Sequence, residues 1–255
     1  MYFQTFTFIM CYFLLFFIVA TILKNNSIVD FGWGLGFVLT NFYLLVINGS
    51  NTPEIWLITL CITLWGGRLF WHIFKRNWGK PEDFRYAAWR KEWGKWVILR
   101  SFFQIFVLQG LIMFMILLPV VSLYQIEIVK MNLATGLGLS VWLIGYYFEV
   151  VGDYQLDQFK KDSNNKGKII TTGLWRYTRH PNYFGEASMW WGIFIMGLSY
   201  GNKIWTIVSP LGITLLLLFV SGVPMLEKSL KKREGYEKYV KETSIFFPLP
   251  PKKNV

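Results

Sequence analysis

The residues of this 255-residue chain best suited to chemistry gather in one stretch, 173–186. It carries Arg176 and Arg179 in a predicted loop, followed by Pro181, a residue that favours the first turn of a helix. We therefore expect a helix to begin at Pro181, with His180 as its cap. Guanidinium groups and the unpaired N–H groups of a helix N-terminus both attract anions, so the combination predicts a phosphate site.

Polar residues continue from this loop into the predicted helix. Asn182, Glu186 and Trp190 recur every four residues and share one helix face. Glu149 and Asp153 have the same spacing at the end of the preceding apolar run. Arginines at a helix start can instead bind lipid phosphate, but that role does not require Asn, His and Glu at these spacings. We therefore favour a binding site here. Arg68 and His72, four residues apart near the end of the third apolar run, repeat the spacing of Glu149 and Asp153, and we interpret these four residues as a polar pocket.

These residues are set in a chain with the composition of a membrane protein. Hydrophobic residues make up 54% of it, aromatic residues 19% and charged residues 16%, which is unusual for a soluble domain. Crossing roughly 30 Å of hydrocarbon takes an apolar run of about 20 residues. We predict an all-α integral membrane protein of about seven transmembrane helices, at Tyr2–Leu23, Phe31–Ile47, Ile55–Phe74, Ser101–Gln125, Leu133–Val151, Tyr183–Tyr200 and Ile204–Val223.

Charge predicts how these helices are oriented. Nearly all of the 26 lysines and arginines fall in residues 75–100, 160–179 and 228–253. Cytoplasmic loops retain basic residues, so we expect the N-terminus outside and the C-terminus in the cytosol. The first apolar run has no basic residue before it, and we interpret it as a retained helix. This topology accounts for the net charge of +11, and we expect lipid headgroups, and no nucleic acid, as partners of the basic loops.

The remaining composition indicates a simple organisation. No internal repeat, low-complexity tract or long linker is visible, so we expect one membrane domain, 1–255, acting as a monomer. Two histidines and two cysteines do not have metal-ligand spacing, and no metal site is expected. Cys11 and Cys61 both lie in predicted spans, where we expect packing rather than a disulfide.

The motif Gly167-Lys-Ile-Ile-Thr-Thr-Gly-Leu-Trp-Arg-Tyr-Thr-Arg-His-Pro-Asn-Tyr-Phe-Gly-Glu186, with Trp190-Trp-Gly192, carries a family resemblance. It resembles the signature of the steroid 5-alpha-reductase-like family, in its DUF1295 branch. Further matches lie at residues 30–36, 65–69, 79–86, 89–94, 152–156, 159–160 and 227–248. The resemblance therefore extends over most of the chain.

The resemblance implies a reductase that binds NADPH from the cytosol and reduces an activated carbon–carbon double bond in a lipid or steroid-like substrate. Segment 152–255 would carry the nucleotide-binding signature, whose residues are Asp153, Lys160, Arg176, Arg179, His180, Asn182, Tyr183 and Glu186. Basic residues among them suit the pyrophosphate and the 2′-phosphate. Hydride transfer to an enone also needs a proton donor for the developing oxyanion, and Tyr86 and Asp30 are the nearest candidates.

A methyltransferase is the competing interpretation. The Arg-His-Pro-x-Tyr cluster also resembles isoprenylcysteine carboxyl methyltransferases, which bind S-adenosylmethionine. Asn182, Glu186 and Asp153-Tyr-Gln155, together with seven spans, favour the reductase. A third possibility is a lipid-binding or transport-like protein without catalysis. The basic rim expected at the cytosolic face argues against it, because a purely apolar ligand needs no such rim.

Overall fold

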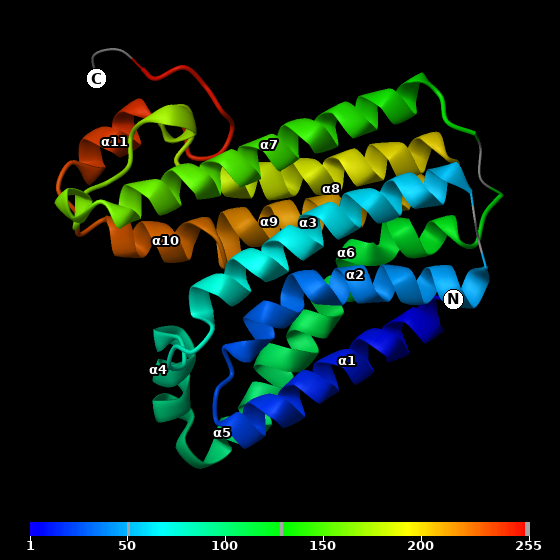
Figure 1. Cartoon of the computed structure of the whole chain (residues 1–255), viewed down its shortest axis with the longest axis horizontal. Helices are drawn as coiled ribbons and strands as arrows, with labels where there is room; N and C mark the ends of the chain where they lie inside the picture. The colour runs from blue at the N-terminus through cyan, green and yellow to red at the C-terminus, as the bar shows by residue number, and fades with distance from the viewer. Residues whose placement is uncertain (50–51, 128–129, 253–255) are drawn as a thin grey trace. The chain divides into compact units, whose positions relative to one another are not determined.

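A computed structural model of the chain describes residues 1–49, 52–127 and 130–252. Every element named within them is a helix, as predicted (Figure 1). The chain divides into two compact units. The first comprises Met1–Lys130 with Tyr200–Thr206, and the second comprises Met131–Ser199 with Ile207–Val255.

The first unit consists of α1 (Tyr2–Leu23), α2 (Ile28–Asn48), α3 (Pro53–Asn77), α4 (Phe84–Trp93), η1 (Gly94–Trp96), α5 (Val97–Ser101), η2 (Phe102–Val107) and α6 (Leu108–Leu123). Local sequence explains the bounds of α3. The Thr52 side chain caps it by accepting the Ile55 N–H, Pro53 opens its first turn, and basic residues Lys75 and Arg76 lie in its last turn. The predicted polar loop before residue 101 is largely helical, because it forms α4, η1 and α5.

Glycines let α2 and α3 cross closely. A Cβ placed on Gly66 would lie 2.6 Å from the Gly34 carbonyl oxygen, a distance that side chains do not tolerate. Further along the same pair, Asn41 Nδ2 donates to Thr59 Oγ1 at 2.9 Å. Lipid offers no hydrophobic drive for helices to associate, so close backbone packing and an interhelical hydrogen bond stabilise the pair instead.

The second unit consists of α7 (Leu133–Lys161), η3 (Ser163–Asn165), η4 (Gly173–Arg176), α8 (Pro181–Ser199), α9 (Val208–Leu215), η6 (Leu216–Val220), α10 (Val223–Leu230) and α11 (Tyr236–Glu242); η5 (Ile204–Ile207) lies at the boundary between the units. Helices α7 and α8 lie side by side (Figure 1). A Cβ on Gly145 would lie 2.6 Å from the Gly185 oxygen, and one on Gly192 would lie 2.7 Å from the Gly138 oxygen. These seven-residue spacings hold the two helices in one register.

Six helices of the described residues are long and apolar enough to cross a membrane, at Tyr2–Leu23, Ile28–Asn48, Pro53–Asn77, Phe84–Leu123, Leu133–Lys161 and Ile204–Leu230. They are consistent with a multi-pass integral membrane protein and cover six of the seven predicted spans. The other predicted span, Tyr183–Tyr200, forms α8. This helix has 19 residues but is not among the six, because Asn182, Glu186 and several glycines lower its hydropathy. The count of seven is therefore not confirmed, and the orientation of the termini stays a prediction.

Candidate functional site

The start of α8 is built around Pro181. The His180 carbonyl accepts the Phe184 N–H at 3.0 Å, which is the first hydrogen bond of the helix. Pro181 occupies the first helical position, where a missing N–H costs nothing. The His180 N–H in turn donates to Thr178 Oγ1 at 3.3 Å. The predicted helix start and cap are thus confirmed.

The C-terminal segment folds back onto the loop that precedes α8. Thr178 and Ser244 form an isolated parallel bridge, and the Arg179 N–H donates to the Ser244 carbonyl at 2.8 Å. The Leu249 N–H donates to the Tyr177 carbonyl at 3.0 Å. The C-terminal segment therefore provides backbone hydrogen-bond partners for the loop, which does not satisfy these groups by itself.

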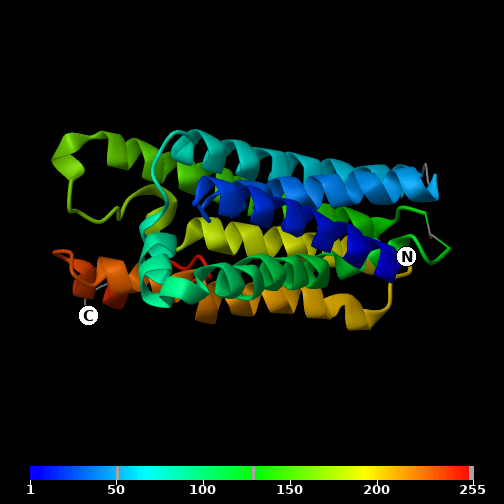
Figure 2. The ribbon, with the colours of Figure 1, turned by 90° about the horizontal axis from the view of Figure 1, so that it is seen from below.

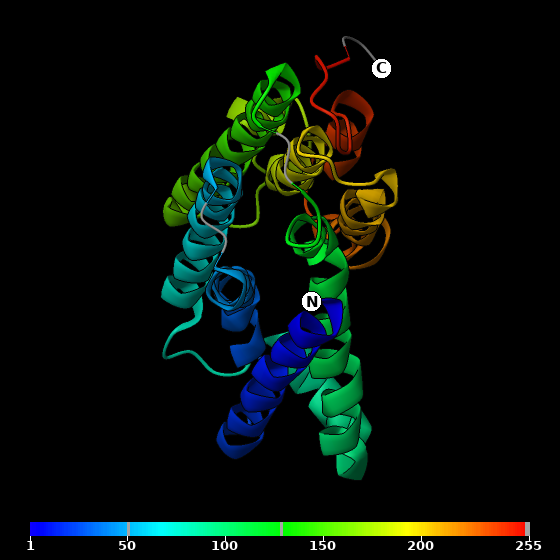
Figure 3. The ribbon, with the colours of Figure 1, turned by 90° about the vertical axis from the view of Figure 1, so that its right-hand side faces the viewer.

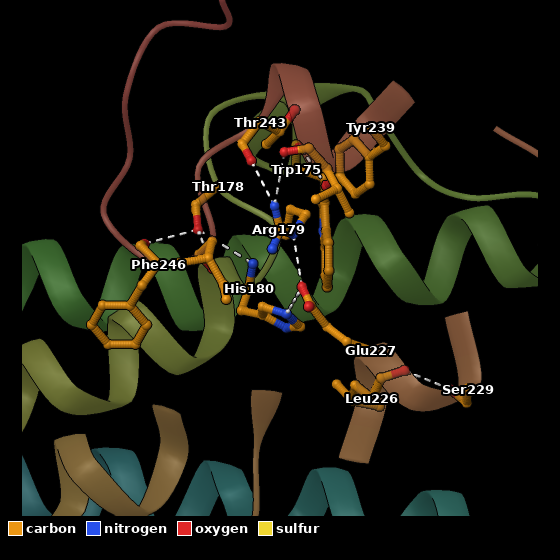
Figure 4. A network of polar contacts seen from close by, with 12 residues as sticks. Trp175, Thr178, Arg179, His180, Leu226, Glu227, Ser229, Tyr239, Thr243 and Phe246 are labelled. Carbon is orange, nitrogen blue, oxygen red and sulfur yellow. Dashed lines mark hydrogen bonds and ion pairs between the residues drawn. The ribbon is translucent and has the colours of Figure 1, made fainter. Parts of the chain in front are cut away.

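Arg179 is the centre of this junction. Its side chain is 8% exposed, and its Nε donates to Glu227 Oε1 at 2.7 Å. Its Nη1 donates to the carbonyls of Thr243 at 2.9 Å and Val240 at 3.2 Å. Figure 4 shows the guanidinium reaching from the start of α8 toward α10 and α11. Arg179 thus joins three helices of the second unit.

The two arginines of the predicted phosphate site have different surroundings. Arg176 is exposed, whereas Arg179 is buried and holds Glu227. Lys160, near the end of α7, is also exposed. In Arg179, Nε and Nη1 are both engaged in hydrogen bonds to the protein. Free basic groups for an anion are therefore found at Arg176, and the structure gives Arg179 a connecting role that the sequence did not indicate.

His180 is fully buried. Its Nε2 lies 3.3 Å from Glu227 Oε1, and its ring stacks on Tyr183 with centroids 5.5 Å apart. Its Nδ1 has no hydrogen-bond partner within the part of the chain that the structure describes. One oxygen of Glu227, Oε1, therefore contacts two cationic or proton-donating side chains, Arg179 and His180.

Asp153 and Asn182 form the second polar pair of this unit. Asn182 Nδ2 donates to Asp153 Oδ1 at 3.2 Å, and Asn182 Oδ1 accepts the Tyr183 N–H at 3.1 Å. Gly152 makes the pair possible, because its backbone lies so close that an added Cβ would be 3.1 Å from Pro181. Tyr183 and Glu186 follow on α8, and Glu186 lies one turn beyond Asn182 on the same face. The eight predicted nucleotide residues all belong to the second unit.

Several residues hold the loop in place in a way that the sequence analysis did not predict, although Gln155 and Tyr239 lie in segments that carry the family resemblance. Gln155 accepts the Leu174 N–H at 2.9 Å, next to Gly173, whose φ of +61° and lack of a side chain allow the approach. Tyr239 donates to the Trp175 carbonyl at 2.6 Å. The signal for Glu227 was its place at the start of the matching segment 227–248, and nothing in the sequence pointed to Arg179 as its partner.

Burial raises the pKa of two tyrosines near Glu227. Burial, followed by the negative charge of Glu227, raises the pKa of Tyr236 to about 12. Burial likewise raises the pKa of Tyr239 above its usual range. Both phenols therefore stay neutral at physiological pH, and Tyr239 acts as a hydrogen-bond donor to the Trp175 carbonyl.

The two predicted catalytic residues lie together in the first unit. Tyr86 Oη donates to Asp30 Oδ1 at 2.7 Å, although 56 residues separate them. Arg85 Nη2 lies 3.4 Å from the other oxygen, Asp30 Oδ2. Tyr86 itself is 6% exposed. A carboxylate held by a phenol and a guanidinium is an arrangement that can exchange protons, while a catalytic role for either residue stays a prediction.

A network of caps positions this pair. Asp83 caps α4 by accepting the Arg85 N–H at 3.0 Å, and the Asp83 N–H donates to Ser27 Oγ at 2.6 Å, just before α2. Glu82 accepts the Asn26 N–H at 2.7 Å and two hydrogen bonds of 2.8 Å from Arg90. Burial opposes the charge of Glu82, but the hydrogen bonds from Arg90 and Asn26 outweigh it and lower its pKa. The start of α4 is thereby fastened to the start of α2.

Comparison with known proteins gives this arrangement a family. The family described as "Protein of unknown function (DUF1295)" matches residues 16–243. An uncharacterized protein of Schizosaccharomyces pombe is 26% identical over 88% of this chain and 73% of its own length. No solved structure gives a significant match.

Two partial matches carry named activities. The 3-oxo-5-alpha-steroid 4-dehydrogenase 1 of Mus musculus is 29% identical over 40% of this chain and 38% of its own length. A probable O-methyltransferase of Ustilaginoidea virens is 31% identical over 41% of this chain and 34% of its own length. The chain thus covers well under half of either relative. Parts of the chain are thus distantly similar to a steroid dehydrogenase and to a probable O-methyltransferase, and the apolar helices are consistent with a multi-pass membrane protein.

Proposed function

Because this chain belongs to the DUF1295 family and is distantly similar to steroid 5-alpha-reductases, we propose that it is an NADPH-dependent membrane reductase. Its substrate is a lipid or steroid-like molecule with an activated carbon–carbon double bond. The observation that carries the proposal is the 2.7 Å hydrogen bond between Tyr86 and Asp30. Reduction of an enone needs a proton for the oxygen that becomes negative, and a phenol next to a carboxyl group supplies one.

The donor set of the second unit fits a dinucleotide. The paired side chains of Asp153 and Asn182 offer a carboxylate oxygen and amide groups for ribose hydroxyls or a carboxamide. Arg176 and Lys160 are exposed and can bind phosphate oxygens. The aromatic ring of Tyr183, which stacks on His180, can contribute an aromatic surface. Bound NADPH would supply the hydride.

Within this proposal, each group of the protein has a separate task. Tyr86 gives its proton to the enolate-like oxygen, and Asp30 exchanges protons with the phenol so that it can be reprotonated. Arg85, 3.4 Å from Asp30, stabilises the carboxylate form between turnovers. Arg179 positions the loop through Glu227 rather than acting mainly on phosphate. The basic loops face the cytosol, where NADPH is present, and the enzyme works as a monomer in the bilayer.

Nucleotide affinity and selectivity test the proposal. In detergent, calorimetry should detect NADPH binding that weakens by about 1.5 to 3 kcal/mol in Asn182→Ala, because a hydrogen bond to a charged partner is lost. Arg176→Ala should weaken NADPH more than NADH if this guanidinium meets the 2′-phosphate. Lys91→Ala, which changes charge on α4, is the matched control at fixed salt. Binding of S-adenosylmethionine without NADPH would reject the reductase.

Methyl transfer is the second candidate, because one partial relative is a probable O-methyltransferase. An activity assay distinguishes the reductase from the methyltransferase. NADPH absorbance should fall when an enone steroid is added to the purified protein, and Tyr86→Phe should slow that loss. A methyltransferase would leave NADPH unchanged and would transfer a labelled methyl group instead.

A further inference from the structure

Two cavities lie along one seam of the first unit, between α1 and the continuous helix formed by α5, η2 and α6. A cavity of about 260 Å³ is lined by apolar side chains that include Met10, Cys11 and Leu14 of α1 and Phe106 of η2. Figures 2 and 3 show α1 and the opposite helix diverging toward the C-terminal end of α1.

The second cavity lies toward the C-terminal end of α1, where polar side chains line it together with Val97 and Ile98. Its volume is about 190 Å³, and its lining includes Lys24, Asn26, Arg90 and Ser101. Between the two cavities Phe17 packs against Phe102 and Phe106, with ring centroids 5.1 and 5.4 Å apart. The chemistry of the seam therefore changes from apolar to basic along the length of α1.

Lys24 gives the polar cavity its net charge. Arg90 in the same lining is neutralised by Glu82, which it contacts through Nε and Nη2, and Nη1 stays available as a donor. Lys24 forms no ion pair among the described residues, and its backbone has a φ of +50°, the one positive φ of a non-glycine residue there. Glycine is favoured at such a helix end, so capping does not explain why this position is a lysine.

We propose that this seam binds one membrane phospholipid with a net negative headgroup. Its phosphate contacts Lys24 and Arg90 Nη1, and one acyl chain runs past Phe17 into the apolar cavity. The dimensions agree, because the ten residues from Leu14 to Lys24 span about 15 Å of helix, which is half of a hydrocarbon core of roughly 30 Å. The proposal does not depend on the reductase function.

Cys11 provides a direct reporter of the acyl chain. It lines the apolar cavity and is exposed, whereas Cys61 is buried. The rate of Cys11 alkylation by N-ethylmaleimide is measured on delipidated full-length protein in detergent, with phosphatidylglycerol or phosphatidylcholine of identical chains added. Phosphatidylglycerol should slow the reaction at about fivefold lower concentration than phosphatidylcholine, the factor expected for one basic residue near the headgroup.

Variants distinguish a specific lipid site from general electrostatic attraction between the basic protein and an anionic lipid. Lys24→Gly removes the ammonium and keeps a residue that favours the left-handed helix end, so the fold is retained, and the two lipids should then protect Cys11 equally. Lys91→Ala, an equal loss of charge on α4, should preserve the preference. Glycerol phosphate, which has no chain, should protect in neither protein.

Three results would overturn the proposal. One is equal protection by both lipids in the unaltered protein, and another is a preference that survives Lys24→Gly. Protection of Cys11 by an enone steroid but by neither phospholipid would make the apolar cavity a substrate pocket instead. Loss of NADPH binding, in contrast, would refute the reductase and leave the lipid site intact.

Discussion

The buried contact between Arg179 and Glu227 allows a quantitative test of how the second unit is assembled. Glu227→Gln keeps the size of the side chain and removes the charge that neutralises Arg179. Breaking a buried ion pair by removing one partner typically costs about 3 to 5 kcal/mol. Glu227 is 16% exposed, so we expect the lower end, about 3 kcal/mol. For a chain of this size that corresponds to a fall of about 6 to 12 °C in the midpoint of thermal unfolding.

The reverse substitution, Arg179→Met, removes the guanidinium and also the donor to the Thr243 and Val240 carbonyls. We expect the free energy of unfolding to fall by a similar amount, because two backbone carbonyls lose a hydrogen-bond donor, at a cost of about 1 kcal/mol each. The double variant Arg179→Met/Glu227→Gln combines the two single substitutions and replaces both charges by neutral groups of similar volume. It should lose less than the sum of the single variants, since no charge is then left buried without a partner.

Two measurements on the detergent-purified protein check this. Thermal unfolding gives the midpoints for the cycle, and hydrogen exchange followed by mass spectrometry reports on segment 236–249, which the contact holds against the loop before α8. Exchange there should rise in both single variants, while exchange in α1 stays constant. Strictly additive midpoints, or unchanged exchange in the tail, would show that Arg179 is not the connection between these helices.

Three further predictions follow from local geometry. Tyr86→Phe should lower kcat of the proposed reduction at least tenfold with little change in NADPH affinity, and equal loss of both in enzyme assays would indicate misfolding instead. Gly145→Val should destabilise the α7–α8 pair by more than about 1 kcal/mol, because its Cβ would lie 2.6 Å from the Gly185 oxygen; a thermal midpoint equal to that of the unaltered protein would contradict the close packing. Because the pKa of Glu82 is lowered in the folded protein, its carboxylate stabilises the fold above the ordinary pKa of 4.5. That stabilisation is lost as the pH falls through the folded-state pKa. Proteolysis of the 78–93 segment should therefore accelerate below about pH 4.5 and vary less with pH in Glu82→Gln.

Much of the architecture was predictable because the bilayer leaves a chain few choices. Apolar runs of about 20 residues must satisfy their own backbone hydrogen bonds in lipid, so they form helices wherever they pack. Six of the seven predicted spans coincide with helices of suitable length and hydropathy. The beginning of α8 was also predictable, because Pro181 restricts the backbone locally and needs no hydrogen-bond partner.

Side-chain partners depended on the tertiary structure. Arg176 and Arg179 are the same residue type, three positions apart, yet one is exposed and the other meets Glu227, 48 residues later. Tyr86 and Asp30 were candidates by resemblance, but their contact joins α4 to α2, whose starts Ser27 and Asn26 also connect by hydrogen bonds. Local sequence determines backbone conformation through short-range sterics and lipid burial. Which polar groups meet across many residues is decided by how the helices pack, and that information is spread over all of their contacts.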